Sequence, residues 1–326
     1  MKPILLLGIG CQKGGTTWLY EYLARHPQVA DDPVKEMHVL DVRHVPYFGD
    51  FHDSKSAYKR ELIAGLGKDG SEAAARRRDR LAAEIEGHER SMAMVRDPRR
   101  YADHMQRLAE SDPAVRLVRD ITPSYAALDA PHWQQVRRDL EERFDLRLVF
   151  IMRDPVDRLF SAYRMGRRRA EDLSAVLSAA SPLEAARNRL RPLKASVVDL
   201  VRRKPKKSPF LAFALEEMNL RRSQYEKTVT AVEAAFPAAQ LHCVLFEDFF
   251  NEAALRRFTD FAGIDFLPTE YAKTKQTASG GAELTDGDVA QLRDRLEPTY
   301  RFCAERFGRD AIAASWKHAG NGRASA

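Results

Sequence analysis

A glycine-rich turn near the N-terminus constrains the fold more than any other part of the sequence. The apolar run at residues 4–8 precedes the turn, which contains Lys13, Gly14 and Gly15. Residues 16–24 then have the spacing of an amphipathic helix. A strand, a glycine turn and a helix in this order form an anion cradle, because the backbone N–H groups and the helix N-terminus point to the same place. The sequence therefore predicts a phosphate site.

This turn differs from the phosphate loop of nucleoside triphosphatases, which reads G-x-x-x-x-G-K-[ST]. Gly10, Gly15 and Thr17 fit that pattern, but Thr16 stands where the lysine should be, and the lysine of this chain comes earlier, at Lys13. We therefore expect the turn to hold phosphate oxygens while its cation is directed at a different atom.

A second basic element follows the apolar run at residues 146–152, which predicts a buried parallel strand. Arg153 comes at the end of this strand, Pro155 suits the first turn of a helix, and Ser161 lies about two turns along that helix. A magnesium-dependent triphosphatase would have an aspartate where Arg153 stands. Two anion sites indicate a nucleotide that is phosphorylated at two separate positions.

In this order, the motifs resemble the two nucleotide-binding motifs of the sulfotransferases, which use 3′-phosphoadenosine 5′-phosphosulfate (PAPS). The segments that carry the resemblance are Lys13-Gly14-Gly15-Thr16-Thr17, Lys35-Glu36-Met37-His38, Asp120-Ile121-Thr122-Pro123-Ser124-Tyr125, Arg153-Asp154-Pro155 with Arg158 and Ser161, and residues 241–249. The second and third segments are most similar to heparan-sulfate-type and related bacterial sulfotransferases. The resemblance extends from residue 4 to about residue 265.

The resemblance implies two groups of donor-binding residues. Lys13 would stabilise the leaving oxygen, the rest of the turn would bind the 5′-phosphate, and Arg153 with Ser161 would hold the 3′-phosphate. In the alternative interpretations, Arg153 forms a structural ion pair with Asp157, and Trp18 is a residue of the hydrophobic core. The predicted donor-binding residues are Lys13, Gly14, Gly15, Thr16, Thr17, Trp18, Arg153 and Ser161. The implied mechanism requires no metal.

Glu36 is the candidate general base, because the resemblance places the catalytic glutamate of the heparan-sulfate-type enzymes here. A carboxylate can accept the proton of a hydroxyl if a neighbouring cation and partial burial adjust its pKa. His38 lies two residues later and is the alternative base, as a histidine is in the small-phenol sulfotransferases. The non-catalytic interpretations are a Glu36 paired with Lys35 and a buried, hydrogen-bonded His38.

One position departs from the heparan-sulfate-type pattern. Many of these enzymes carry a lysine directly before Thr-Pro-x-Tyr, whereas this chain has Ile121. Either Arg119 or Lys35 replaces that cation, or Lys13 acts alone. Residues 122–125 either line the acceptor cleft or form a structural turn.

Composition narrows the class of protein. With 44% hydrophobic and 31% charged residues, the 326-residue chain is typical of a globular protein. It has no apolar run long enough for a membrane span and no secretory leader pattern, so we expect a cytoplasmic protein. Cys11, Cys243 and Cys303 are far apart, which favours reduced thiols over a metal site. Cys11 lies in the phosphate turn, but no partner base for a nucleophile is evident.

The net charge of +6 has a bearing on binding partners. Basic runs at residues 76–78, 167–169 and 202–207 would suit nucleic acid, but no nucleic-acid-binding motif accompanies them. We therefore expect no nucleic-acid partner. These runs are interpreted as solvated helical faces, some of which attract an anionic cofactor or acceptor.

Alternating strand and helix patterns predict an α/β fold, a P-loop-like three-layer α/β/α arrangement around a central parallel sheet. We expect one domain over residues 1–318, with a helical insertion or lid at about 164–224, and a disordered tail at 319–326. A basic loop at 273–281 is expected to close over the nucleotide. The predicted strands are 4–8, 116–120, 146–152 and 241–246. The predicted helices include 16–24, 54–90, 101–110, 133–144, 225–236, 253–262 and a final pair over 284–307, with Pro298 at the break between the two.

The sequence thus predicts transfer of a sulfuryl group from PAPS to a hydroxyl, less readily to an amine, leaving adenosine 3′,5′-bisphosphate. The resemblance implies a small-molecule or carbohydrate acceptor. Two alternatives stay open. One is a P-loop kinase with an altered loop, which would need ATP and Mg²⁺. The other is a non-catalytic protein that binds a nucleotide or nucleic acid.

Overall fold

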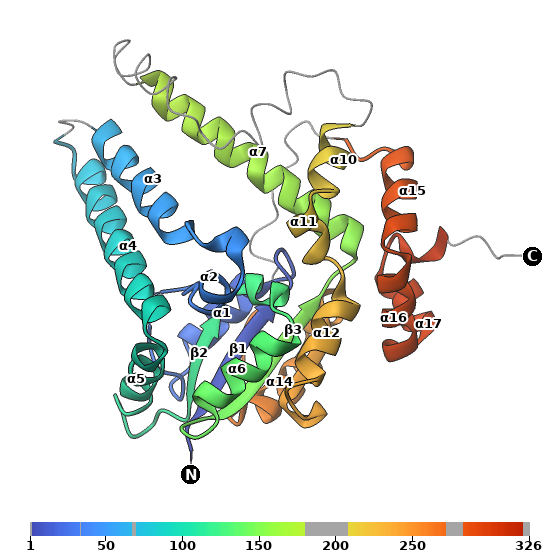
Figure 1. The fold of residues 1–326 in the computed structure, drawn as a ribbon, viewed down its shortest axis with the longest axis horizontal. Coiled ribbons are helices and arrows are strands. Elements are labelled where there is room, and N and C mark those ends of the chain that lie inside the picture. The colour runs from blue at the N-terminus through green and yellow to red at the C-terminus, as the bar shows by residue number, and fades with distance from the viewer. Residues whose placement is uncertain (1, 33, 67–69, 180–207, 272–282, 322–326) are drawn as a thin grey trace, which may run out of the picture.

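A parallel β-sheet forms the centre of the computed structural model, which describes residues 2–32, 34–66, 70–179, 208–271 and 283–321 (Figure 1). Its four strands are β1 (Ile4–Gly10), β2 (Leu117–Ile121), β3 (Asp145–Met152) and β4 (Leu241–Leu245), and they lie in the order β2-β1-β3-β4. All three strand pairings are parallel, so the carboxyl ends of the strands share one edge of the sheet.

Alternate residues of the strands face two separate hydrophobic cores. Leu5 and Leu7 belong to one core, whereas Leu6 belongs to the other. The helices over the first face are α5 (Pro98–Ala109), α6 (Ala130–Leu140), α12 (Tyr225–Glu233) and α16 (Glu297–Phe307), and those over the second face are α1 (Thr16–Ala24) and α14 (Glu252–Ala262). The predicted three-layer α/β/α fold with a central parallel sheet is therefore confirmed.

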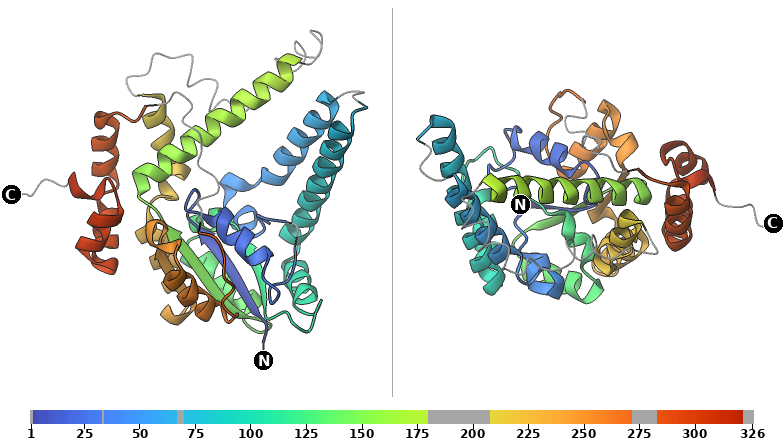
Figure 2. Two further views of the ribbon diagram at one scale, coloured as in Figure 1. Left: turned by 180° about the vertical axis from the view of Figure 1, so that it is seen from behind. Right: turned by 90° about the horizontal axis from the view of Figure 1, so that it is seen from above.

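Three long helices extend beyond the carboxyl edge of the sheet. The neighbouring helices α3 (Phe51–Gly65) and α4 (Glu72–Arg96) rise together, and α7 (Pro155–Ala179) runs obliquely across the same end of the molecule (Figures 1 and 2). The sequence predicts one polar helical region over residues 54–90, whereas two helices are present. Ser71 caps the second, since its hydroxyl accepts a hydrogen bond from the Ala74 N–H at 3.2 Å.

The last helices differ from the prediction that Pro298 separates a pair. The first of them, α15 (Asp286–Arg295), ends earlier, and Pro298 lies in the first turn of α16. A proline suits that position because its missing N–H has no helical partner there. A further helix, α17 (Arg309–Ser315), and a 3₁₀ turn at Ala319–Asn321 follow, so the tail predicted as disordered begins with a defined turn.

The predicted insertion at 164–224 is described in part, as the end of α7 and the short helices α10 (Pro209–Ala214) and α11 (Glu217–Arg221). Residues 180–207, the loop predicted to close over the nucleotide and residues 322–326 lie outside the described residues. The single domain over 1–318 stays a prediction.

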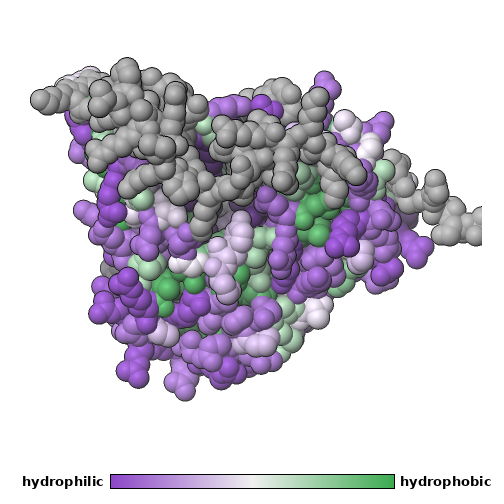
Figure 3. Space-filling view, turned by 45° about the horizontal axis from the view of Figure 1, so that its top comes forward, coloured by the Kyte–Doolittle hydropathy of each residue, from purple (hydrophilic) through white to green (hydrophobic). Residues whose placement is uncertain are grey.

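Hydrophilic side chains dominate the face drawn in Figure 3, with smaller apolar areas between them. Tyr47, which is 60% exposed, is the one large hydrophobic residue that is exposed among the described residues. Within the described residues, no helix has both the length and the apolar composition needed to cross a bilayer.

Candidate functional site

A cleft of about 1820 Å³ opens at the carboxyl edge of the sheet and brings together the sequence motifs. Lys13 and Glu36 line it from the loops after β1 and α1, and Arg153 and Ser161 line it from the end of β3 and from α7. The strand order reverses between β1 and β3, and ligands of parallel α/β sheets bind at such a reversal. Of the predicted site residues, those that line the cleft are Lys13, Gly15, Thr16, Thr17, Trp18, Glu36, His38, Arg153 and Ser161.

Glycines shape the phosphate turn because side chains would not fit. Gly15 has a φ of 85° and precedes α1 directly, and a Cβ built on it would lie 2.8 Å from the Phe250 ring. A Cβ on Gly14 would lie 2.8 Å from the Ile151 carbonyl oxygen. These contacts lie inside the protein, so the two glycines let the turn pack closely against β3 and the residues after β4. Gly14 itself does not line the cleft, and its N–H donates to the Cys11 carbonyl oxygen at 2.9 Å.

The Lys13 side chain lies in a crowded positive environment. Burial lowers the pKa of its ammonium group to about 8, and the charges of Arg153, Arg168 and Arg169 act in the same direction. Such a cluster of cations is stabilised by an anion, because a bound negative charge offsets their mutual repulsion. The phosphate turn thus fits the anionic group that the sequence predicts for it.

Of the two cations suggested as replacements at the Ile121 position, one lies in the cleft. The Lys35 ammonium donates a hydrogen bond to the Thr17 hydroxyl at 2.7 Å and lies 3.6 Å from a Glu36 oxygen. Arg119 is 3% exposed, stacks over the Tyr20 ring and does not belong to the cleft lining. Lys35 therefore links the phosphate turn to the candidate base.

Arg153 is tied to the same turn from the other side of the cleft. Its Nη1 donates to the Lys13 carbonyl oxygen at 3.3 Å, and its guanidinium lies 5.0 Å from the centre of the Phe246 ring. Asp157, the alternative partner, instead pairs with His318 at 3.2 Å. The guanidinium is therefore held beside the phosphate turn and faces the cleft.

Two other residues of this motif have structural roles. The Asp154 carboxylate accepts hydrogen bonds from the Tyr300 hydroxyl at 2.8 Å and from the His318 N–H at 2.8 Å. Arg158 is fully buried and donates to the Ser223 hydroxyl at 2.7 Å and to the Gln12 amide oxygen at 3.2 Å. These contacts fix the start of α7 against the phosphate turn.

Glu36 and His38 lie side by side, and His38 has a second carboxylate behind it. The distances are 3.4 Å from His38 Nε2 to Glu36 Oε2 and 2.7 Å from His38 Nδ1 to Asp41 Oδ2. The Ser124 hydroxyl donates to the same Asp41 oxygen. The Glu36 side chain is 38% exposed, whereas the His38 side chain is only 8% exposed. Glu36 is therefore the member of this group that a substrate can reach.

The pKa shifts of this pair have opposite signs. Burial favours neutral His38, but Asp41 and Glu36 outweigh it and raise its pKa to about 9. Burial likewise favours neutral Glu36, but the hydrogen bond and the charge of His38 hold the pKa of this carboxyl below its ordinary value. Near neutral pH the resting pair is thus a protonated imidazole and an ionised carboxylate.

A chain of hydrogen bonds holds the His38 backbone from behind. His38 has a φ of 50°, which is strained for a residue other than glycine. Its carbonyl oxygen lies 3.0 Å from His52 Nε2, the Nδ1 atoms of His52 and His88 are 3.1 Å apart, and His88 Nε2 lies 2.8 Å from the Lys59 ammonium. An ammonium group can only donate, so His88 Nε2 accepts from Lys59. The neutral His88 ring then donates from Nδ1 to His52 Nδ1, and the neutral His52 ring donates from Nε2 to the His38 carbonyl oxygen.

Burial lowers the pKa of both supporting histidines, that of His88 to about 3, which agrees with neutral rings. Sequence analysis missed this support and also missed Asp41. The three-residue spacing of His38 and Asp41 was a usable signal for that pair. His52 and His88 belong to different helices, and no sequence pattern links them.

Residues 122–125 combine the two roles proposed for them. Pro123 and Ser124 line the cleft, whereas the Thr122 hydroxyl accepts a hydrogen bond from the Met37 N–H at 3.1 Å. The Tyr125 hydroxyl donates to Asp120 at 2.6 Å. This turn therefore holds the Glu36–His38 loop in place and also forms part of the wall.

Trp18 and Cys11 lie mainly in the core. Trp18 is 7% exposed and stacks on Tyr22 with ring centroids 5.7 Å apart, although part of it reaches the cleft. Cys11 is fully buried, and burial raises the pKa of its thiol. A buried, protonated thiol is a poor nucleophile, which agrees with the structural interpretation of Cys11.

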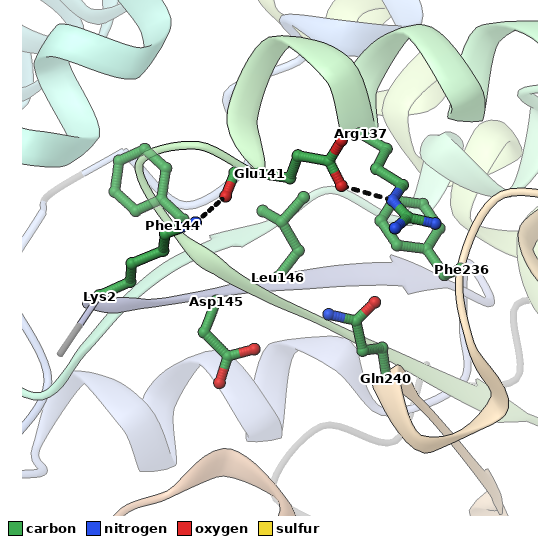
Figure 4. A pocket seen from close by; sticks show the side chains of 8 residues that line it. All are labelled: Lys2, Arg137, Glu141, Phe144, Asp145, Leu146, Phe236 and Gln240. Atoms are coloured by element: carbon green, nitrogen blue, oxygen red, sulfur yellow. Dashed lines mark hydrogen bonds and ion pairs between the residues drawn. The ribbon is translucent and has the colours of Figure 1, made fainter.

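A second pocket, of about 260 Å³, lies at the opposite edge of the sheet, near the start of β3 (Figure 4). Its charged groups already have partners: Arg137 pairs with the Glu141 carboxylate at 2.6 Å, and the Lys2 ammonium donates to the Glu141 carbonyl oxygen at 2.7 Å. None of the predicted site residues lines this pocket. The larger cleft is therefore the candidate site.

Known proteins are similar to this chain in sequence and in fold. The sequence matches the family described as "Sulfotransferase family" over residues 3–197. The fold is similar to the crystal structure of a sulfotransferase from Alicyclobacillus acidocaldarius, with a TM-score of 0.51, 19% identity, and coverage of 94% of this chain and 95% of that one. That likeness shows a shared fold.

Two further solved structures are less similar. A sulfotransferase domain from the curacin biosynthetic pathway has a TM-score of 0.42 and 14% identity, and covers 86% of this chain and 81% of its own. A sulfotransferase domain from the Synechococcus PCC 7002 olefin synthase has a TM-score of 0.40 and 16% identity, with coverages of 90% and 94%. No curated protein sequence matches this chain.

Proposed function

The chain belongs to the sulfotransferase family, and from this premise we propose that it transfers a sulfuryl group from PAPS to an acceptor hydroxyl, most readily of a carbohydrate or glycoconjugate. One observation carries the proposal. Lys13, Glu36 and Arg153 line a single cleft, so two anion-binding elements and an ionised carboxylate face the same space. We call the phosphate turn with Arg153 and Ser161 the donor side, and the part of the cleft beyond Glu36 the acceptor side.

The donor side fits a nucleotide with two phosphate-bearing positions. The N–H groups of the turn and the N-terminus of α1 suit a 5′-phosphate, and Arg153 with Ser161 suits a 3′-phosphate. Lys13 would neutralise the negative charge that develops on the bridging oxygen as its bond to sulfur breaks. Asp154 would have no part in binding a metal, because its carboxylate caps α7 and bonds Tyr300 and His318.

Glu36 is the better candidate for the general base. His38 has a pKa of about 9, so near neutral pH its ring already carries both protons and cannot accept another. Glu36 is ionised and reachable, and its Oε2 is held by His38. In the proposed step the acceptor oxygen forms its bond to sulfur, the bond from sulfur to the 5′-phosphate oxygen breaks, and the hydroxyl proton passes to Glu36.

Calorimetry tests the nucleotide assignment. Adenosine 3′,5′-bisphosphate should bind much more tightly than ATP, with or without Mg²⁺. Preference for ATP would favour the kinase alternative and would contradict the proposal.

Labelled PAPS tests the reaction. Incubation with fractionated carbohydrate and small-molecule acceptors should move the label to an acceptor in step with release of the bisphosphate. Tight nucleotide binding with no transfer of label to any fraction would indicate a non-catalytic protein instead.

A further inference from the structure

The described lining of the cleft carries a surplus of positive charge. Among the described residues, eleven lysines and arginines line the cleft, together with three acidic residues. The lining residues that carry charge are Lys13, Lys35, Lys55, Lys59, Arg80, Arg90, Arg153, Arg164, Arg168, Arg169 and Arg222, with Glu36, Glu84 and Glu86.

The donor does not account for this surplus. A phosphate monoester and a phosphosulfate carry about four negative charges together near neutral pH. The donor side offers Lys13 and Arg153, with Lys35 next to them. The remaining cations of the lining belong to α3, α4 and α7 and, directly after α11, to Arg222, and several lie on the acceptor side.

Lys55 lies on the opposite flank of Glu36 from the phosphate turn. One Glu36 oxygen is 3.6 Å from Lys35, on the side of the turn, and the other faces His38 at 3.4 Å. The His38 ring packs on Phe51 with centroids 3.8 Å apart, and the Lys55 ammonium lies 5.5 Å from the Phe51 ring centre. The order is therefore phosphate turn, Glu36, His38, Phe51 and Lys55.

Arg169 lies on α7, which contacts α3, and it lines the same cleft. Burial lowers the pKa of Lys55 to about 8, and the charges of Arg169 and Lys59 act in the same direction. The charge of Arg169 also acts on Lys13, so this guanidinium faces the space between the phosphate turn and Lys55. Neither Lys55 nor Arg169 forms an ion pair with another described residue, whereas the neighbouring Arg167 pairs with Glu171 at 3.2 Å. The charge of Glu36 acts on both cations, but no described carboxylate lies within ion-pair distance of either. Like charges close together repel each other, and a bound anion would relieve that repulsion.

We infer that the acceptor side binds an acceptor that carries a carboxylate or sulfate group, and that Lys55 and Arg169 contact that group. The inference rests on the proposed sulfuryl transfer, because the hydroxyl that gives its proton to Glu36 must lie on this flank. A charged group bound beyond Glu36 orients the acceptor and favours anionic acceptors over neutral ones of the same shape.

Three probes with the same sugar hydroxyls at positions 2, 3 and 4 test the inference: 4-nitrophenyl β-glucuronide, 4-nitrophenyl β-glucoside 6-sulfate and the neutral 4-nitrophenyl β-glucoside. Their affinities are measured by calorimetry on the protein saturated with adenosine 3′,5′-bisphosphate, so that the donor side is filled. We expect at least one anionic probe to bind about tenfold or more tightly than the neutral one. Whether the glucuronide or the sulfate ester is preferred identifies the group.

Variants locate the contact. Lys55→Ala and Arg169→Ala should each reduce the preference for the anionic probe, whereas Arg167→Ala, on the same helix, should keep it. Equal affinity for charged and neutral probes, failure of both anionic probes to bind, or a preference that survives in both variants would overturn the inference. Binding of the bisphosphate is measured first: its absence would refute the proposed function, whereas normal binding with no anion preference refutes only the inference.

Discussion

The donor side and the acceptor side of the cleft are built in different ways. On the donor side, the cleft is lined by residues at the ends of β1 and β3, neighbouring strands of one sheet, and by Ser161 in the second turn of α7. On the acceptor side, the cleft is lined mainly by side chains of α3, α4 and the later turns of α7, which extend beyond the sheet (Figure 2). A strand end fixes the position of a group more firmly than a projecting helix does, which suits a constant donor and a variable acceptor.

Lys35 and Glu36 lie where the two sides meet. Lys35 bonds Thr17 of the phosphate turn and pairs with Glu36, which in turn pairs with His38. A substitution on one side therefore leaves the geometry of the other side unchanged only if the contacts of Lys35 and Glu36 are kept. Variants on each side should therefore have separable effects on kcat and on nucleotide binding.

Removing the donor-side cation should have the largest effect. We expect Lys13→Ala to lower kcat by about 10³-fold, because no other group replaces the charge at the leaving oxygen. Transfer of label from PAPS measures kcat, and Lys2→Ala, which changes a lysine at the opposite edge of the sheet, serves as control. A rate within about tenfold of the wild type would remove Lys13 from the proposed mechanism.

Removing the base should separate the two sides. We expect Glu36→Gln to lower kcat by about 10²-fold while the Kd for adenosine 3′,5′-bisphosphate stays within about twofold, because the amide keeps the shape but cannot accept the proton. Glu86→Gln, in the same cleft, serves as control. A larger loss in His38→Asn than in Glu36→Gln would reassign the base to His38.

Removing the second anion contact should act on the donor side alone. We expect Arg153→Ala to raise the Kd for adenosine 3′,5′-bisphosphate by about 30-fold, which corresponds to the loss of a hydrogen bond to a charged group. The Kd for AMP, which lacks the 3′-phosphate, should rise far less. Calorimetry measures both increases in Kd, with Arg167→Ala as control. Equal losses for both nucleotides would place Arg153 at the 5′-phosphate.

The same contrast explains what the sequence predicted. The donor side was predictable because its features are local: an apolar run, a turn with Gly14 and Gly15 and a helix at 16–24 follow one another directly. The parallel sheet followed from strands that alternate with helices. The structure bears out the fold and brings Lys13, Glu36 and Arg153 into one cleft, and their roles stay predictions.

The acceptor side was less predictable because it depends on packing between distant segments. His52 and His88 meet at 3.1 Å only because α3 and α4 lie side by side. Lys55 and Arg169 line the same cleft from helices about a hundred residues apart in the chain. Each of these residues, taken alone in the sequence, reads as a polar position on a helix, so no pattern separates it from a solvated neighbour.

The pH dependence of nucleotide binding should report on the donor side. The pKa of Lys13 is about 8, below its ordinary value, so its charge is present below pH 8 and lost above it. We expect the affinity for adenosine 3′,5′-bisphosphate to fall by about tenfold between pH 7 and pH 9. Lys13→Arg should flatten this profile, because a guanidinium stays protonated. An unchanged profile in that variant would assign the titration to another group.

The smallest expected effect concerns the support behind the acceptor side. His52→Phe fills the same space but removes the hydrogen bond to the His38 carbonyl oxygen, so the strained backbone at His38 loses a constraint. One hydrogen bond of this kind is worth about 1 kcal/mol, and we expect kcat to fall by about fivefold while the nucleotide Kd is unchanged. Steady-state kinetics and calorimetry on the same preparations check both values.

His52→Gln distinguishes positioning from simple packing. A glutamine amide can donate to the His38 carbonyl oxygen from about the position of the imidazole Nε2, so this variant should recover most of the lost kcat although it packs less well than phenylalanine. If the kcat values of the two variants instead followed their thermal stabilities, His52 would act only as a core residue. Lys35 and Glu36 would then be the described residues that connect the donor side with the acceptor side.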